Sequence, residues 1–207
     1  MKVLEYGELS ANIVLLQPVG EHELEALEKE FSMIRMNSGK TLCLAAFMVE
    51  DWNKDLSPWK APAVFGKEDF GDGAESSLME ILKYCEDESK TYYIGGYSLA
   101  GLFALWSAYR TDRFEAVAAV SPSMWFPGFD DYMKEQEIKC GNVYLSLGDK
   151  EEKARNPVMA TVGDKIRAAH TLLKDLDVNC TLEWNVGNHF REPEVRTAKG
   201  FSWCIDK

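Results

Sequence analysis

Hydrophobic residues come in short continuous runs that alternate with stretches of mixed polarity. Runs of this length without polar alternation are typical of strands covered on both faces. The pattern predicts a short edge strand at 3–6 and buried strands at 11–17, 41–49, 92–97, 114–120, 142–147 and 180–186.

The stretches between these runs carry leucines or aromatic residues at helical spacing. They predict helices at 21–33, 74–86, 99–110, 130–139, 158–176 and 191–203. Pro193 suits the first turn of the last helix, because its missing N–H has no partner there in any case. Strands that alternate with helices predict a mostly parallel sheet with helices on both faces.

Residues 50–73 contain several prolines and glycines and follow neither period. We expect a long loop near the active site, since long loops in compact domains commonly act as lids or binding surfaces. Its aromatic residues either pack the loop onto the body of the protein or line a pocket, and the sequence leaves both uses open.

The stretch 92–110 passes from an apolar run into Ser98, and a helical pattern begins directly after it. This order predicts a strand, a sharp turn and a helix, with the serine at the apex. Gly96 and Ala100 leave the space that such a turn needs, and Gly101 lets the helix approach its strand. The motif reads G-x-S-x-A, where G-x-S-x-G is usual.

Composition and charge narrow the class of protein. A chain of 207 residues with 46% hydrophobic content suits a single domain over 1–207. The formal net charge of -11 argues against a nucleic-acid partner. The first residues lack the apolar core of a signal peptide, and no run reaches the ~20 apolar residues of a membrane span. We therefore expect a cytoplasmic protein with no membrane partner.

The five cysteines stand at wide spacings without a C-x-x-C pair, so we expect them to be reduced and structural. No set of side chains has the spacing of metal ligands, so we expect neither a metal nor a cofactor. The oligomeric state is not indicated by the sequence.

Residues suited to catalysis follow three of the predicted strands. Ser98 follows one, the acidic cluster Asp149, Glu151 and Glu152 follows a later one, and His189 follows the last. Functional groups gather at the carboxyl ends of parallel strands. The order serine, acid, histidine is that of the α/β-hydrolases.

A serine hydroxyl needs a base to take its proton as it attacks. His189 is the candidate base, because the other two histidines, His22 and His170, lie in predicted helices. We expect those two at the surface or at the edge of the core, although His22 follows a strand end and is able to approach the site.

Three segments, 95–101, 121–125 and 187–190, carry a resemblance to a known family. The chain resembles the compact α/β-hydrolases of the serine esterase group that includes esterase D, feruloyl esterases and enterobactin-type siderophore esterases. The resemblance covers most of the chain from about residue 11. It implies a three-layer α/β-hydrolase fold with a minimal cap domain or none, and hydrolysis of a small-molecule carboxylic ester. It does not name the substrate.

The resemblance also implies the acid that supports the histidine. In similar hydrolases this acid often stands three positions after a strand-ending glycine, which from Gly148 gives Glu151. We prefer Glu151, with Asp149 as the second choice. The acid has to accept a hydrogen bond from the imidazole and stabilise the imidazolium.

An oxyanion hole needs two backbone N–H donors. Leu99, just after the serine, is expected to give one, and the loop after the 11–17 strand the other. Pro18 has no N–H, so Val19 or Gly20 is expected, and here the chain departs from the common His-Gly pattern of that loop.

Trp125 resembles an aromatic residue that the family carries near its site. Trp52 and Trp59 are expected to form a wall of the substrate pocket, with core packing as the alternative.

Two other functions remain open. The same three residues would serve thioester hydrolysis or acyl transfer, and the sequence does not separate these from ester cleavage. A binding protein on a hydrolase scaffold is of a different class, and the presence of both Ser98 and His189 argues against it.

Overall fold

The computed structural model describes residues 1–207. Its middle layer is a seven-stranded sheet in the order β1-β3-β2-β4-β5-β6-β7. Only β1 is antiparallel, to β3, and all other neighbours run parallel, so the prediction of a mostly parallel sheet is confirmed. The strands are β1 (Lys2–Gly7), β2 (Ile13–Val19), β3 (Leu42–Met48), β4 (Thr91–Tyr97), β5 (Phe114–Val120), β6 (Asn142–Gly148) and β7 (Asn179–Asn185).

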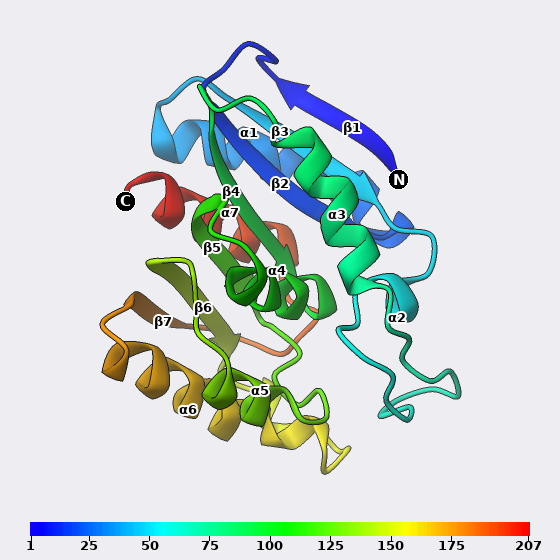
Figure 1. Ribbon diagram of the computed structural model, residues 1–207. Coiled ribbons are helices and arrows are strands. Elements are labelled where there is room, and N and C mark those ends of the chain that lie inside the picture. Colours follow the sequence, from blue (N-terminus) through cyan, green and yellow to red (C-terminus); the bar gives the residue numbers. More distant parts are fainter.

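Helices cover both faces of the sheet. The α-helices are α1 (Leu27–Ser38), α2 (Trp52–Asp55), α3 (Ala74–Tyr84), α4 (Leu99–Arg110), α5 (Phe129–Glu135), α6 (Val162–Asp175) and α7 (Pro193–Ile205). Three short 3₁₀ helices are η1 (Glu21–Ala26), η2 (Glu151–Lys153) and η3 (Met159–Thr161). In Figure 1, α1 and α7 lie behind the sheet, with α3 and α4 in front of it.

The two apolar layers of the core follow from this arrangement. Phe31 and Ile34 of α1 pack with Phe201 of α7 on one face, while residues of α3, α4 and α6 fill the larger layer on the other. No helix combines the length and the apolar character needed to cross a membrane.

The helix expected at 21–33 is divided into two elements. The carboxylate of Glu23 accepts a hydrogen bond from the N–H of Gly20 at 2.9 Å, which closes a tight first turn, and the segment begins as η1. The α-helix then continues to Ser38, beyond the expected end. Gly39 stops it with φ 62°, a left-handed conformation that favours glycine.

The 50–73 loop is packed onto the body through its middle. It contains α2 and an isolated bridge between Ala61 and Phe70. Phe70 is buried, and the indole N–H of Trp59 donates to the carbonyl of Pro127 at 2.9 Å. Part of the loop therefore belongs to the core.

The turn between β4 and α4 places Ser98 at its apex with φ 59° and ψ -120°. Such a conformation costs about 1–3 kcal/mol for a residue other than glycine, and it persists because the neighbours leave no alternative. A Cβ on Gly101 would lie 2.8 Å from the carbonyl oxygen of Gly96 and 2.9 Å from that of Val120. The close contact of α4 with β4 and β5 therefore requires glycine there.

Two carboxyl groups interrupt the apolar packing beside η1. Glu30 lies on the buried face of α1 with Leu27, Phe31 and Ile34, and only 4% of it is exposed. Burial raises the pKa of Glu30 well above its ordinary value, and the nearby Glu23 charge adds to the effect. Burial also raises the pKa of Glu23 to about 7, against the lowering effect of the Gly20 N–H.

We expect Gly101→Ala to lower the free energy of unfolding by about 2 kcal/mol, because the new methyl group meets backbone oxygens that cannot move aside. Gly141→Ala is the matched control, since a Cβ there meets nothing within 4 Å. Urea unfolding followed by circular dichroism measures both. Equal stability of the two variants would show that α4 has room to shift.

We expect the wild-type protein to lose stability as the pH rises from 5 to 8. The pKa of both carboxyls is raised in the folded state, so above the ordinary value of 4.5 the folded state binds more protons than the unfolded chain. The free energy of unfolding therefore falls with pH through this window. Between pH 5 and 8, the free energy of unfolding of Glu23→Gln should rise relative to that of the wild type by at most about 3 kcal/mol.

Urea unfolding at each pH measures this gain, with Glu28→Gln, an exposed change on α1, as the control. A gap between Glu23→Gln and wild type that stays constant with pH would contradict the prediction.

Candidate active site

Ser98, His189 and Glu151 form one hydrogen-bonded chain. The Nε2 atom of His189 lies 3.0 Å from the Oγ atom of Ser98, and its Nδ1 atom lies 2.7 Å from Oε2 of Glu151. The three residues follow β4, β7 and β6, whose carboxyl ends share one edge of the sheet. The structure thus brings together the serine, the histidine and the preferred acid of the sequence analysis.

The second oxygen of Glu151 is surrounded by donors. Its Oε1 atom accepts hydrogen bonds from the N–H of Gly148 at 2.8 Å, the hydroxyl of Ser121 at 2.8 Å and the guanidinium of Arg196 at 3.0 Å. The carboxylate is buried, with 4% of its side chain exposed. These bonds hold it in a single orientation toward His189.

Arg196 of α7 also fixes the loop that carries His189. Its Nη2 atom donates to the carbonyl of Val186 at 3.2 Å and to that of Asn188 at 3.0 Å. The hydroxyl of Tyr97 donates to the carbonyl of His189 at 2.7 Å. Burial raises the pKa of Tyr97 to about 12, so this hydroxyl keeps its proton at neutral pH. The imidazole is therefore held by its own main chain as well as by Glu151.

The sequence analysis missed Arg196, Ser121 and Tyr97. The signal for Arg196 was its place on α7, where Gly200 and Phe201 at helical spacing are buried. A charged side chain on a buried face needs a partner of opposite charge. Ser121 lies in the 121–125 segment, directly after β5, and has φ 41°.

The other two acids of the cluster have different partners. Asp149 is exposed, and its Oδ1 atom accepts a hydrogen bond from the N–H of Gly187 at 2.8 Å. Glu152 forms an ion pair with Arg167 at 2.8 Å. Neither carboxylate contacts His189.

The expected oxyanion donors differ in their position relative to the cleft. Leu99 is the first residue of α4, where an N–H has no acceptor within the helix. Val19 and Gly20, by contrast, do not line the cleft beside Ser98. Val19 is the last residue of β2, and the N–H of Gly20 donates to Glu23, so their role as oxyanion donors stays a prediction. His22 of η1 lines the cleft in their place.

A cleft of about 910 Å³ borders Ser98 and His189. Five tryptophan, tyrosine and phenylalanine side chains line it, namely Trp52, Phe65, Tyr97, Trp125 and Phe190.

Trp59 is not among the lining residues, so its expected place in the pocket wall needs correction. Its ring packs on Phe126, Phe129 and Tyr132. Its indole N–H finds an acceptor in Pro127, which holds the side chain in the body of the protein.

Acidic and basic side chains line different parts of the cleft. Glu23, Glu30 and Glu194 line the wall formed by η1, α1 and α7. Lys150, Lys153 and Arg155 line the wall near η2. No group of three or more His, Cys, Asp or Glu side chains is arranged to hold a metal ion.

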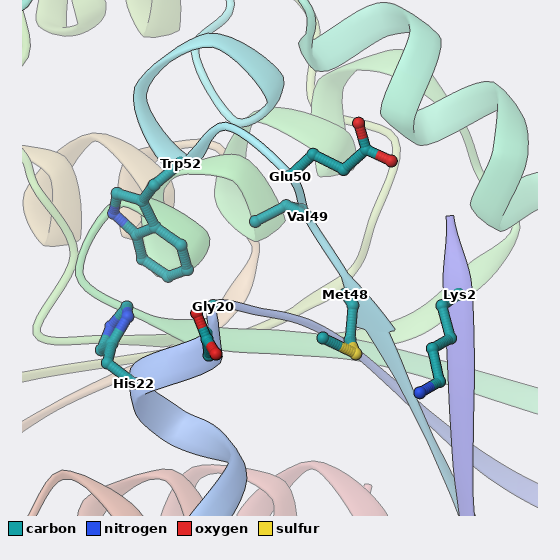
Figure 2. A pocket seen from close by; sticks show the side chains of 8 residues that line it. Lys2, Gly20, His22, Met48, Val49, Glu50 and Trp52 are labelled. Atoms are coloured by element: carbon teal, nitrogen blue, oxygen red, sulfur yellow. The ribbon is translucent and has the colours of Figure 1, made fainter.

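A second hollow of about 530 Å³ lies near the ends of β1 and β3. His22 and Trp52 line both this hollow and the cleft, and their rings meet edge to face with centroids 5.0 Å apart. Figure 2 shows the indole facing the imidazole, with Lys2 and Glu50 farther away. The hollow contains neither Ser98 nor His189.

No family model matches the chain, and no curated protein matches it by sequence. Solved structures do match. An IroE-like serine hydrolase from Shewanella oneidensis is 16% identical, with a TM-score of 0.74 over 97% of this chain and 74% of that chain. The siderophore hydrolase EstA from Aspergillus nidulans is 19% identical, with a TM-score of 0.70 over 97% of this chain and 85% of that chain.

An α/β serine hydrolase without a lid, from Xanthomonas campestris, is 14% identical, with a TM-score of 0.60 over 99% of this chain and 87% of that chain. At this level of identity the likeness concerns the fold. The chain has the three-layer α/β-hydrolase fold, and no cap domain is evident in it.

Proposed function

We propose that the protein is a serine hydrolase that cleaves a small-molecule carboxylic ester through an acyl-enzyme on Ser98. The hydrogen-bonded chain of Ser98, His189 and Glu151 carries this proposal. The similar folds of a serine hydrolase and a siderophore hydrolase support it.

In the first half of the reaction, Oγ of Ser98 attacks the carbonyl carbon of the ester while Nε2 of His189 takes the hydroxyl proton. Glu151 keeps the other ring nitrogen protonated and stabilises the imidazolium. The N–H of Leu99 stabilises the negative oxygen of the tetrahedral intermediate, together with an N–H from the first turn of η1. His189 then returns the proton to the leaving alcohol, and the acyl group stays on Ser98.

In the second half, His189 takes a proton from a water molecule that attacks the acyl carbonyl. The bond to Oγ of Ser98 breaks, the proton returns to that oxygen, and the carboxylic acid leaves. The open cleft admits water without a cap domain having to move. A thiol leaving group, or an alcohol in place of water, would use the same steps, which keeps thioester hydrolysis and acyl transfer within this proposal.

We expect the wild-type protein to form a single covalent adduct with a fluorophosphonate, located on Ser98. An unactivated serine does not react in this way, because its hydroxyl lacks a base. Intact-mass spectrometry should find no adduct on Ser98→Ala and strongly reduced labelling of His189→Ala. His170→Ala, which changes the histidine of α6, should label like wild type. A folded wild-type protein that forms no adduct would favour the binding-protein alternative.

We expect Glu151→Gln to lower kcat/KM for p-nitrophenyl butyrate by about a thousandfold, since the amide cannot stabilise the imidazolium. Asp149→Asn should stay within about twofold of wild type, because its amide oxygen still accepts the Gly187 N–H. Thermal unfolding of both variants accompanies the kinetics. The larger loss in Asp149→Asn would transfer the acid's role to the second choice.

A further inference from the structure

Glu30 places a buried carboxyl group at the border of the cleft. The residue is 4% exposed, it lines the same cleft as Ser98 and His189, and its Oε1 atom has no hydrogen-bond partner. A buried carboxyl oxygen without a hydrogen-bond partner is costly, and such an exception in a native protein calls for an explanation, although Gln17 lies near the same group. The position of Glu30 therefore indicates that it meets a polar group of a bound molecule.

Other acidic groups lie near Glu30 and disfavour its ionised form. Glu23 of η1 and Glu194 of α7 both raise the pKa of Glu30, and only the side chain of Gln17 on β2 lowers it. Glu194 is balanced by Lys29 at 2.7 Å. Neither Glu23 nor Glu30 forms an ion pair with a lysine or arginine, and the nearest basic nitrogen to Glu23 is Nε2 of His22 at 4.0 Å.

The other residues that line the cleft would orient a bound molecule relative to Glu23 and Glu30. Aromatic rings of Trp52, Phe65 and Phe190 provide apolar contact for a carbon chain. Lys150, Lys153 and Arg155 on the other wall repel a cation. A molecule with a positive end would therefore lie with that end toward Glu23 and Glu30.

We propose that Glu23 and Glu30 form a subsite for an ammonium group of the substrate, so that the preferred substrates are esters that carry a primary amine. This inference rests on the proposed ester hydrolysis at Ser98. A primary ammonium has three N–H donors, enough to bond to more than one carboxyl group. It also removes the repulsion between them, and such charge-assisted bonds are strongest in a buried setting.

Binding of an amine should release protons. Burial raises the pKa of Glu23 to about 7 and that of Glu30 well above its ordinary value, so both carboxyls keep their protons to a higher pH than an exposed glutamate does. A nearby positive charge favours the ionised form of each. A general attraction to the negative surface of the protein would not release protons in this way.

The kinetic test uses two pairs of esters whose members differ only by an ammonium in place of a methyl group. The first pair is p-nitrophenyl 6-aminohexanoate and p-nitrophenyl heptanoate, with the amine on the acyl side. The second is 6-aminohexyl butyrate and heptyl butyrate, with the amine on the alcohol side. We expect wild type to favour the ammonium member of at least one pair by about tenfold in kcat/KM, as one charge-assisted hydrogen bond supplies.

Two variants test whether Glu30 is the source of the preference for the ammonium ester. Glu30→Gln has nearly the same shape but no charge, and the ratio between the two esters should fall to about one. Glu28→Gln removes the same charge from an exposed position of α1 and should keep the wild-type ratio. A wild-type ratio of about one in both pairs would overturn the proposal, and so would a ratio that Glu30→Gln leaves unchanged.

Calorimetry tests the ammonium subsite separately from the proposed hydrolysis. It uses the Ser98→Ala variant, so the test remains possible if Glu30→Gln fails to fold. Hexylammonium should bind to Ser98→Ala with release of protons, seen as a binding enthalpy that differs between buffers of different ionisation enthalpy. Hexanol is the neutral control. Binding without turnover of any ester would refute hydrolysis alone, whereas turnover of the neutral esters without hexylammonium binding would refute the ammonium subsite alone.

Discussion

The buried ion pair between Glu151 and Arg196 is the interaction on which the rest of the site depends. Each side chain is nearly inaccessible to water, and each has further hydrogen bonds that satisfy its remaining atoms. Burying either charge alone would be strongly unfavourable. The pair therefore forces the end of β6, the start of α7 and the loop after β7 to meet at one point. That meeting sets the place of His189 relative to Ser98.

Much of this arrangement was predictable from sequence, because the signals are local. The buried strands and most helices follow from apolar runs and helical spacing, and Ser98 is marked by the glycines around it. The parallel sheet then requires Ser98, His189 and the acidic cluster to share one edge. The choice of Glu151 among the acids came from the resemblance to known esterases, and the contact with His189 agrees with it.

Other features depend on contacts between distant segments, and sequence patterns carry little information about those. The indole N–H of Trp59 donates to the carbonyl of Pro127, and the main-chain N–H of Gly20 donates to the carboxylate of Glu23. Neither partner was foreseeable from spacing alone. Glu30 and Arg196 did leave a local sign, since each is a charged residue at an apolar helical position. Such exceptions to the amphipathic pattern were the most informative residues of the site and its surroundings.

The loop that carries His189 is held mainly through main-chain carbonyls, which accept from Arg196 and Tyr97. Every residue type has such a carbonyl. Side chains at Val186 and Phe190 are largely exposed, so they are free to change without moving the imidazole. Because Phe190 also borders the cleft, new substrate preferences can evolve there by single substitutions while the hydrolytic geometry is preserved. The positions that tolerate substitution are thus different from the positions that hold the catalytic geometry.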